Sequence, residues 1–320
     1  MLRVVVILML VSCSLHLRAQ SCCSGGVPLS NNIGLSPQQK GTWQLNTSYD
    51  LNTLNTLKAG TTVLNDDSRR RQTHSILFQL GYTFFRRWSA EVFVSYVRQE
   101  RRIRQFGQED FTFTQGIGDA VALVKYQLIA KEKQSLFVGL GAKIPTGSPD
   151  LRSQQGLRLN ADLQPGSGAW DAILWTQYQR PINLRPSMTW SLTGIYTTKG
   201  TNEEYLGSQA YQFGQEVQVI STLSDQVFVA KQIFNPSLIV RYRQVQGDQQ
   251  NEQLVPGTGG SWLFIAPALA WQVNPQFSMS SSLELPIFAE VTDTQVTPTH
   301  RLQLGLSYLL TRKEPETNRR

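Results

Sequence analysis

Residues that commonly catalyse reactions or bind metals are scarce in this sequence. Of its three histidines, one lies in the N-terminal apolar segment, which leaves His74 and His300. Two separated histidines offer no metal site, and no Ser-His-acid set is evident. No glycine-rich phosphate loop precedes a helix, because no amphipathic helix is evident. We therefore expect no enzyme activity and no catalytic, cofactor-binding or metal-binding residues.

The cysteines predict no disulfide framework, because the three of them lie at Cys13, Cys22 and Cys23. The vicinal pair Cys22 and Cys23 leaves two interpretations open. It could bind a metal or form a bridge to a partner in an oxidising compartment, or it could be an oxidisable part of a flexible tail.

Charged residues instead recur at alternate positions within otherwise uncharged segments. Both signs are present among them. Such groups either pair with each other across a filled interior or line a water-filled passage that selects by charge, and the sequence leaves both alternatives open. The candidate lumen-lining residues are Glu91, Asp119, Lys125, Lys143, Asp171, Glu216, Arg241, Arg243, Glu284 and Arg301.

Runs of ten to fourteen residues with alternating apolar positions must position these charges. In residues 73–85, for example, Ile76, Phe78 and Leu80 alternate with polar residues. This period of two predicts strands with two different faces, and their length suits a tilted membrane-spanning strand. We predict strands at 41–50, 73–86, 88–100, 117–129, 135–145, 169–180, 186–198, 209–222, 234–246, 261–273, 276–290 and 300–311.

The connections between these strands alternate between short and long. Arg86-Arg87 and Asn274-Pro275 are tight, whereas 50–72 and 146–168 are long. Transmembrane barrels have short periplasmic turns and longer external loops, so we expect both termini to be periplasmic. Two connections fit this alternation less well. Residues 223–233 are either a longer turn or an extra piece of strand, and residues 291–299 are long for a connection on one side.

The N-terminus has the features of a secretory signal peptide. Arg3 precedes an apolar run, and Ala19 is the last residue before the expected cleavage. No later apolar run approaches the roughly 20 residues that a spanning helix requires. We therefore predict an all-β protein, a transmembrane up-and-down antiparallel β-barrel of about 12 strands. Its parts are a signal peptide (1–19), a flexible N-terminal segment (20–39), the outer-membrane β-barrel (40–311) and a polar C-terminal tail (312–320).

The formal net charge of +7 is concentrated in a few basic clusters. Arg69-Arg70-Arg71 and Arg101-Arg102 fall in predicted external loops, and further basic residues lie in the tail. In an exported protein these clusters would meet lipopolysaccharide and outer-membrane lipid rather than nucleic acid. We expect no cofactor, and protein partners are not predicted.

Three motifs depart from simple alternation. They are Gly116-Ile117-Gly118-Asp119, then Lys143-Ile144-Pro145-Thr146-Gly147, then Pro165-Gly166-Ser167-Gly168 followed by Asp171. In this order they resemble the outer-membrane β-barrel family named after the meta-pathway of phenol degradation, whose members are labelled as transporters. The resemblance covers residues 40–311, and the Cys22-Cys23-Ser24-Gly25-Gly26 start resembles a Bacteroidetes-type subgroup. It implies an outer-membrane barrel of a Gram-negative bacterium that moves small, hydrophobic or aromatic molecules.

The loop between the second and third motifs has two interpretations. It either folds inward as a constriction or is a structural turn. The function likewise has two interpretations, namely passage of small molecules through the barrel or a closed structural or partner-binding barrel. The final strand presents Leu306 to lipid, and it should pair with the first strand near residues 43–47 so that no edge stays free.

Overall fold

The computed structural model describes residues 40–105, 107–153, 155–183, 185–207 and 209–311. The predicted signal peptide, the segment with Cys22 and Cys23, and the C-terminal tail lie outside these residues. The described chain is all-β apart from a 3-10 turn at Ala161–Leu163. Its strands are β1 (Thr42–Gly60), β2 (Thr62–Val63), β3 (Arg69–Phe85), β4 (Trp88–Gln105), β5 (Gln108–Ile117), β6 (Ala120–Lys131), β7 (Gln134–Ile144), β8 (Asp171–Ile182), β9 (Arg185–Lys199), β10 (Thr201–Leu206), β11 (Gln209–Gln212), β12 (Glu216–Ser224), β13 (Val227–Val229), β14 (Gln232–Val245), β15 (Gln249–Gln250), β16 (Gln253–Leu254), β17 (Gly260–Gln272) and β18 (Phe277–Thr311).

Eleven of these strands form a closed antiparallel ring, in the order β1, β3, β4, β6, β7, β8, β9, β12, β14, β17 and β18. β18 folds back on itself, because its first part pairs with β17 and its second part with β1, and both ladders end at Val291. A straight strand of its 35 residues would be about 115 Å long. The backbone turns at Asp293, which has a φ of 54°. Counting β18 twice, the chain crosses the barrel twelve times, as predicted.

The first and last strands close the barrel. Thr47 pairs with Leu306, and Trp43 pairs with Leu310. This register confirms the predicted pairing, which leaves no unpaired edge in the ring.

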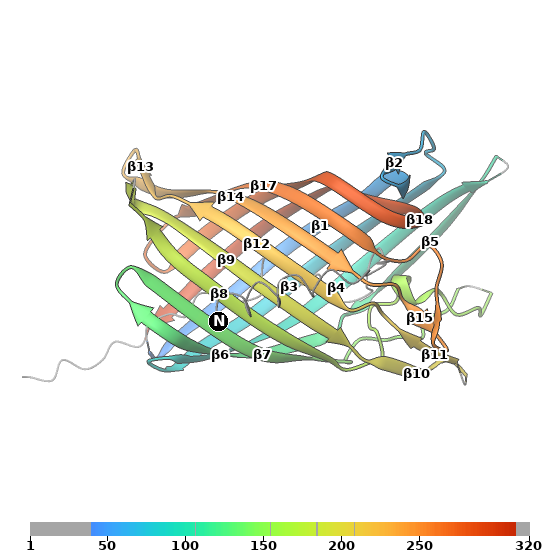
Figure 1. The fold of residues 1–320 in the computed structure, drawn as a ribbon, viewed down its shortest axis with the longest axis horizontal. Coiled ribbons are helices and arrows are strands. Elements are labelled where there is room, and N and C mark those ends of the chain that lie inside the picture. Colours follow the sequence, from blue (N-terminus) through green and yellow to red (C-terminus); the bar gives the residue numbers. More distant parts are fainter. Residues whose placement is uncertain (1–39, 106, 154, 184, 208, 312–320) are drawn as a thin grey trace, which may run out of the picture.

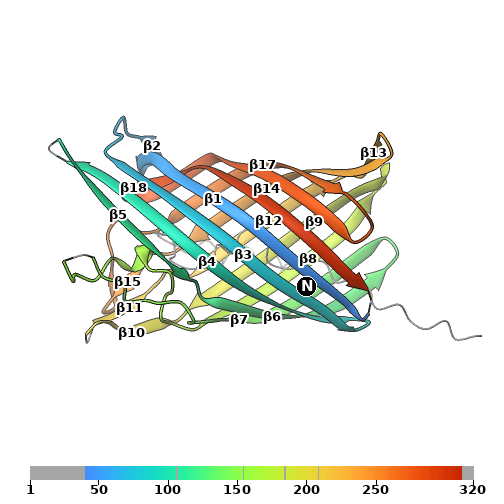
Figure 2. The same cartoon turned by 180° about the vertical axis from the view of Figure 1, so that it is seen from behind.

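The two ends of the barrel differ in their connections (Figures 1 and 2). At one end, which we call the short-turn end, β3 and β4 are joined by two residues and β17 and β18 by residues 273–276. At the other end, the long-loop end, lie β2, β5, residues 145–170 and a four-stranded sheet of β10, β11, β15 and β16. The described residues contain no helix long and apolar enough to cross a membrane.

Several strands continue past the predicted boundaries at the long-loop end. β1 runs to Gly60 rather than to residue 50, and β4 pairs with β5 as far as Gln105. The residues between the predicted strands 88–100 and 117–129 are therefore mostly a hairpin rather than a loop. The sequence alternation that predicts a strand requires an apolar outer face. The backbone hydrogen bonds between strands do not require one, so the strands continue where the outer face meets water.

Three other boundaries also differ from the prediction. The predicted strand 209–222 is interrupted at 213–215, where Gly214 lies so close to the backbone of Gln246 that a Cβ atom there would clash. Residues 291–299 belong to β18 rather than to a long connection. Residues 223–233 contain both alternatives, since β13 and β14 form a short hairpin there.

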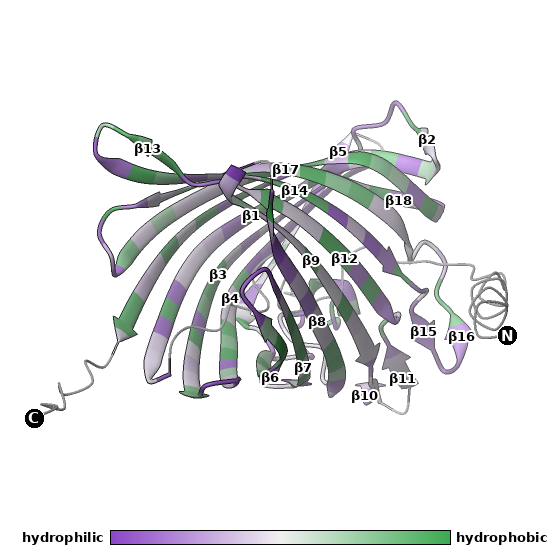
Figure 3. Cartoon of the chain, turned by 60° about the vertical axis from the view of Figure 1, so that its left-hand side comes forward, coloured by the Kyte–Doolittle hydropathy of each residue, from purple (hydrophilic) through white to green (hydrophobic). Residues whose placement is uncertain are grey.

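The outer face of the ring is apolar, as predicted. Leu306 is 44% exposed, and Ile76, Phe78 and Leu80 are also exposed. Figure 3 shows hydrophobic and hydrophilic residues alternating along the strands. Aromatic rings gather on this face near the short-turn end, where Trp43 stacks on Tyr82 with centroids 4.3 Å apart. This arrangement is typical of an aromatic girdle at a membrane interface.

Candidate functional site in the barrel interior

A cluster of the inward side chains is apolar, which the sequence analysis did not predict. The side chains come from inward positions on seven neighbouring strands, and each is at most 6% exposed. Ile239 of β14 packs against them. We call this cluster the apolar belt, and its members are Leu77, Phe93, Val121, Leu123, Phe137, Ile173, Trp175, Ile195 and Ile220.

A cavity of about 370 Å³ borders the apolar belt. Leu77 and Phe93 of the belt line it together with uncharged polar residues such as Asn46, Gln79 and Ser280. The lining contains no charged side chain among the residues that the structure describes.

Six buried or partly buried charges of alternating sign follow one another across the wall from the start of β6 to β14. Lys143 Nζ lies 2.9 Å from Asp119 and 3.1 Å from Asp171. Lys199 Nζ lies 3.3 Å from Asp171 and 3.9 Å from Glu216. The last link is the 2.8 Å contact between Glu216 and Arg243 Nε. We call this series the charge ladder. It lets each buried charge meet an opposite one, which offsets the cost of desolvation.

Three further ion pairs lie elsewhere in the interior, two between neighbouring strands and one, Arg241 with Glu284, across β17. Lys125 contacts Glu91 at 3.2 Å. The other two pairs are Arg241 with Glu284 at 2.5 Å and Arg301 with Asp50 at 2.7 Å. All ten candidate lumen-lining residues therefore have an ion-pair partner. Of the two predicted alternatives, pairing across the interior is observed, and lining of a passage stays a prediction.

Aromatic rings flank several of these cations. Lys125 Nζ lies 5.4 Å from the ring centroid of Trp175, and the guanidinium of Arg241 lies 4.3 Å from that of Phe264. Because the ring faces carry negative charge density, they stabilise the cations in a desolvated setting. The interior thus combines ion pairs with the apolar belt.

The three sequence motifs meet at Asp119. Its carboxylate accepts hydrogen bonds from Lys143 Nζ at 2.9 Å, from the backbone of Gly147 at 3.1 Å, and from both the backbone and hydroxyl of Ser167. Gly147 and Gly166 lie in backbone contact, so that a Cβ atom on Gly166 would clash with Gly147. Glycine is therefore required at this crossing.

Residues 145–170, which we call the strap, fold inward across the long-loop end. Asp162 lies 2.6 Å from Arg71, and the backbone oxygen of Gln164 accepts a hydrogen bond from Gln99 at 3.2 Å. On the opposite side the hydroxyl of Tyr205 accepts a hydrogen bond from the Ala161 backbone at 2.9 Å. Because both Arg71 and Gln99 are buried inward-facing residues, these contacts place the strap inside the mouth of the barrel. The loop is therefore not merely a surface turn.

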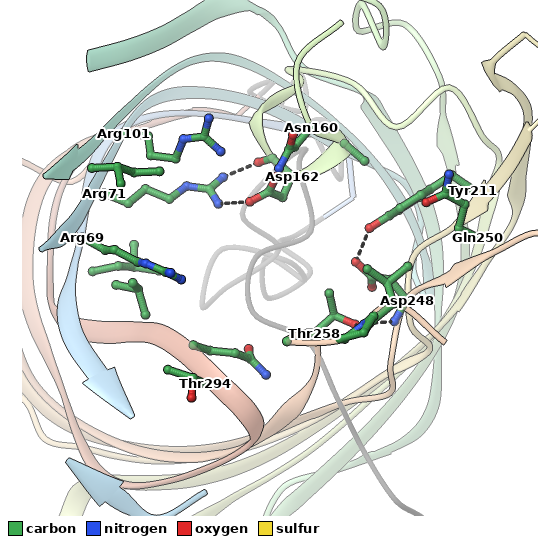
Figure 4. A pocket seen from close by; sticks show the side chains of 18 of the residues that line it. Arg69, Arg71, Arg101, Asn160, Asp162, Tyr211, Asp248, Gln250, Thr258 and Thr294 are labelled. Carbon is green, nitrogen blue, oxygen red and sulfur yellow. Dashed lines mark hydrogen bonds and ion pairs between the residues drawn. The ribbon is translucent and has the colours of Figure 1, made fainter. Parts of the chain in front are cut away.

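A cavity of about 530 Å³ lies at the long-loop end between the strap and the barrel wall (Figure 4). Arg69, Arg71 and Arg101 point into it from β3 and β4. We call this cavity the vestibule. Tyr211 and Asp248 lie on its opposite side.

The expectation that both basic clusters meet lipopolysaccharide stays a prediction, and the structure limits it to the outward residues of each cluster. Arg71 and Arg101 face inward, and the residues next to them along each strand face outward. Only these outward residues can contact lipid from outside. Arg98 and Arg102 are such outward residues, with side chains 45% and 55% exposed. The cause is the continuation of β3 and β4, which imposes a strand's alternation on residues predicted to be loop.

Sequence reasoning missed several interior charges because of the same boundaries. Lys199 follows the predicted end of its strand by one residue, and Arg71 precedes the predicted start of its strand by two. Extending the inward alternation would have identified Lys199, Arg71 and Arg101. Nothing in the sequence pattern identifies Asp162, because its position depends on the fold of the strap. Among the described residues, no group of three or more His, Cys, Asp or Glu side chains could hold a metal ion.

Comparison with known proteins gives one family and a set of similar barrels. A model of the family described as "Putative MetA-pathway of phenol degradation" matches residues 101–295. The COG4313 outer membrane channel from Pseudomonas putida F1 is 13% identical with a TM-score of 0.66, over 87% of this chain and 100% of that one. The transport unit of the autotransporter AIDA-I from Escherichia coli is 8% identical with a TM-score of 0.49, over 88% and 93% of the two chains. No curated protein matches the sequence.

Proposed function

Because the chain belongs to the phenol-degradation MetA-pathway family, we propose that it is an outer-membrane channel for small hydrophobic or aromatic molecules. The apolar belt is the observation that carries this proposal. A passage for hydrophilic solutes is lined by polar groups, whereas Leu77 and Phe93 of the belt line a cavity and offer apolar contact to a solute there. The cavities at about 370 and 530 Å³ are large enough for small molecules.

The proposal includes a cellular setting. A cleaved signal peptide exports the chain, and the long-loop end faces outward in the outer membrane of a Gram-negative bacterium. There the outward residues Arg98 and Arg102 contact lipopolysaccharide phosphates. The Cys22-Cys23 start supports assignment to the Bacteroidetes-type subgroup.

Transport in proteoliposomes and in cells tests the channel. Purified protein should give channel steps in planar bilayers, and cells that express it should take up naphthalene faster than cells that lack it. Sugar uptake should change less than naphthalene uptake. Absence of channel steps, together with liposomes that swell no faster with the protein than without it, would contradict the proposal.

A closed structural or partner-binding barrel is the second candidate. The strap and the ion-paired interior favour it, because the strap is held in the mouth of the barrel and the interior charges pair with one another. The same conductance and uptake measurements separate the two functions, since a closed barrel gives neither current nor uptake.

A further inference from the structure

We propose that the vestibule binds small organic carboxylates that carry an apolar body. This inference rests on the proposed function and names a substrate class for the same channel. The basic wall of the vestibule is the first observation. Arg71 and Arg101 lie directly opposite each other in the register of β3 and β4, and Arg69 lies two residues along on the same inward face. Like charges in such positions repel each other unless an anion neutralises them.

The protein neutralises only part of this wall. Asp162 binds Arg71, whereas Arg69 and Arg101 have no ion-pair or hydrogen-bond partner among the residues that the structure describes. The Nε atom of Arg101 is shielded from solvent and unpaired within that same part of the chain. A buried guanidinium N–H without an acceptor is costly, so an incoming anion would be stabilised here.

The carboxylates of the vestibule do not balance its arginines. Three inward arginines, Arg69, Arg71 and Arg101, share its lining with Asp162 and Asp248, while Arg70 at its edge pairs with Asp67 at 3.2 Å. Asp248 accepts hydrogen bonds from the Tyr211 hydroxyl at 2.7 Å and from the Gly214 backbone at 2.9 Å, which hold it away from the arginine wall (Figure 4). The cavity therefore keeps an excess of positive charge.

Apart from Asp248, the opposite wall offers mainly aromatic and aliphatic side chains. Tyr205 and Tyr211 lie with ring centroids 4.7 Å apart, and Val255 packs against this cluster. Burial, and then the neighbouring charge of Asp248, raise the pKa of the Tyr211 phenol above its ordinary value, so the phenol stays neutral. This wall offers contact to an aromatic or aliphatic body.

The two walls together define the ligand. A guanidinium matches the geometry of a carboxylate and binds it through two parallel hydrogen bonds. An inorganic anion would leave the apolar wall without contact, and a neutral hydrocarbon would leave Arg69 and Arg101 without an acceptor. A carboxylate attached to an apolar body satisfies both walls.

Equilibrium dialysis of benzoate against the full-length protein in lipid nanodiscs tests this inference without requiring conduction. Benzoate should bind, whereas benzyl alcohol, benzylamine and inorganic phosphate should bind more weakly. The Arg69→Gln/Arg101→Gln variant should raise the benzoate dissociation constant about tenfold or more, because two charge-assisted contacts are lost. The matched variant Arg98→Gln/Arg102→Gln removes the same charge from the outer face, and it should change the constant by less than about twofold.

The outcomes are distinct. Lack of benzoate binding, equal binding of benzyl alcohol or phosphate, or an equal loss in both double variants would overturn the inference. Wild-type selectivity among the four probes decides the question even if a variant fails to fold, and heat-modifiable gel mobility shows whether it folds. If the barrel binds benzoate but carries no current, only the proposed channel is refuted. If it carries current but does not bind benzoate, only the vestibule site is refuted.

Discussion

At the scale of single residues, the interior and the outer face respond to charge in opposite ways. The outer face meets hydrocarbon, where a charge lacks both water and a partner. The inner face already holds many charges, and each of the ten candidate residues lies against an opposite charge. The effect of a new charge on insertion and stability therefore depends on the face of the barrel that carries it.

The neighbouring residues Leu306 and Ser307 test the assignment of faces. Leu306→Arg should cost about 2 to 4 kcal/mol and prevent stable insertion, because it places a charge against lipid near the midplane. Ser307→Arg, on the opposite face, should be tolerated or alter only permeation. Heat-modifiable gel mobility measures both. Equal loss of the folded band, or loss only for Ser307→Arg, would show that the faces are reversed.

The buried pair of Glu91 and Lys125 tests the role of interior ion pairs. Lys125→Met should lower the free energy of unfolding by about 3 to 5 kcal/mol, because it leaves the Glu91 carboxylate without its cation. The double variant Glu91→Gln/Lys125→Met should recover most of this loss. Urea unfolding in lipid vesicles measures the change, with Lys133→Met in an exposed short turn as the control. A double variant no more stable than Lys125→Met would refute this account.

At the scale of elements, the strap is the segment whose position most affects the mouth of the barrel. Its polar contacts attach it both to the barrel wall and to the β10 and β11 region. The motif residues around Asp119 hold its two ends. Asp162 holds its middle to Arg71, and the side chain of Gln164 bonds within the strap to the backbone of Leu151 and Leu159. The middle can therefore be released without disturbing the ends.

Releasing the middle of the strap should widen the mouth. In the variant Asp162→Ala/Gln164→Ala, single-channel conductance should rise and the strap should become easier to cleave with protease. Arg152→Ala, at the exposed tip of the strap, should leave both properties unchanged. If conductance falls or stays constant while cleavage increases, the strap does not limit the mouth.

At the scale of the whole molecule, the barrel has two dissimilar ends and must adopt one orientation in its membrane. Short turns gather at one end, and the strap, the vestibule and the four-stranded sheet gather at the other (Figure 1). Outer-membrane barrels place short turns in the periplasm, which predicts that the vestibule opens to the outside.

Labelling of intact cells checks this orientation. In a background with Cys22 and Cys23 replaced by serine, Asn251→Cys in the long-loop sheet should react with a membrane-impermeant maleimide. Glu132→Cys, in the turn between β6 and β7, should react only after the outer membrane is disrupted. The reverse result would invert the topology, and labelling of neither residue in disrupted cells would point to poor exposure of both sites.

The sequence alone determined the barrel, its twelve crossings and its closure between residues 43–47 and the last strand. It could do so because lipid requires an apolar outer face, and a strand's period of two records that requirement locally. The same alternation placed residues such as Glu91 and Glu284 on faces that are buried in the structure. At the long-loop end the apolar alternation stops before the strands do, because the strands continue there without lipid contact.

Only the tertiary structure decided what the interior contains. Asp119, Gly147 and Ser167 meet because two strands and the strap converge, and such convergence depends on register between distant segments. The sequence did not predict the apolar belt, because Leu77 and Ile173 lie on distant strands and form a cluster only when the ring brings those strands together. Arg101 points into the vestibule because a hairpin, not a loop, carries it, and the backbone pairing that forms this hairpin leaves no local signature in its charged residues.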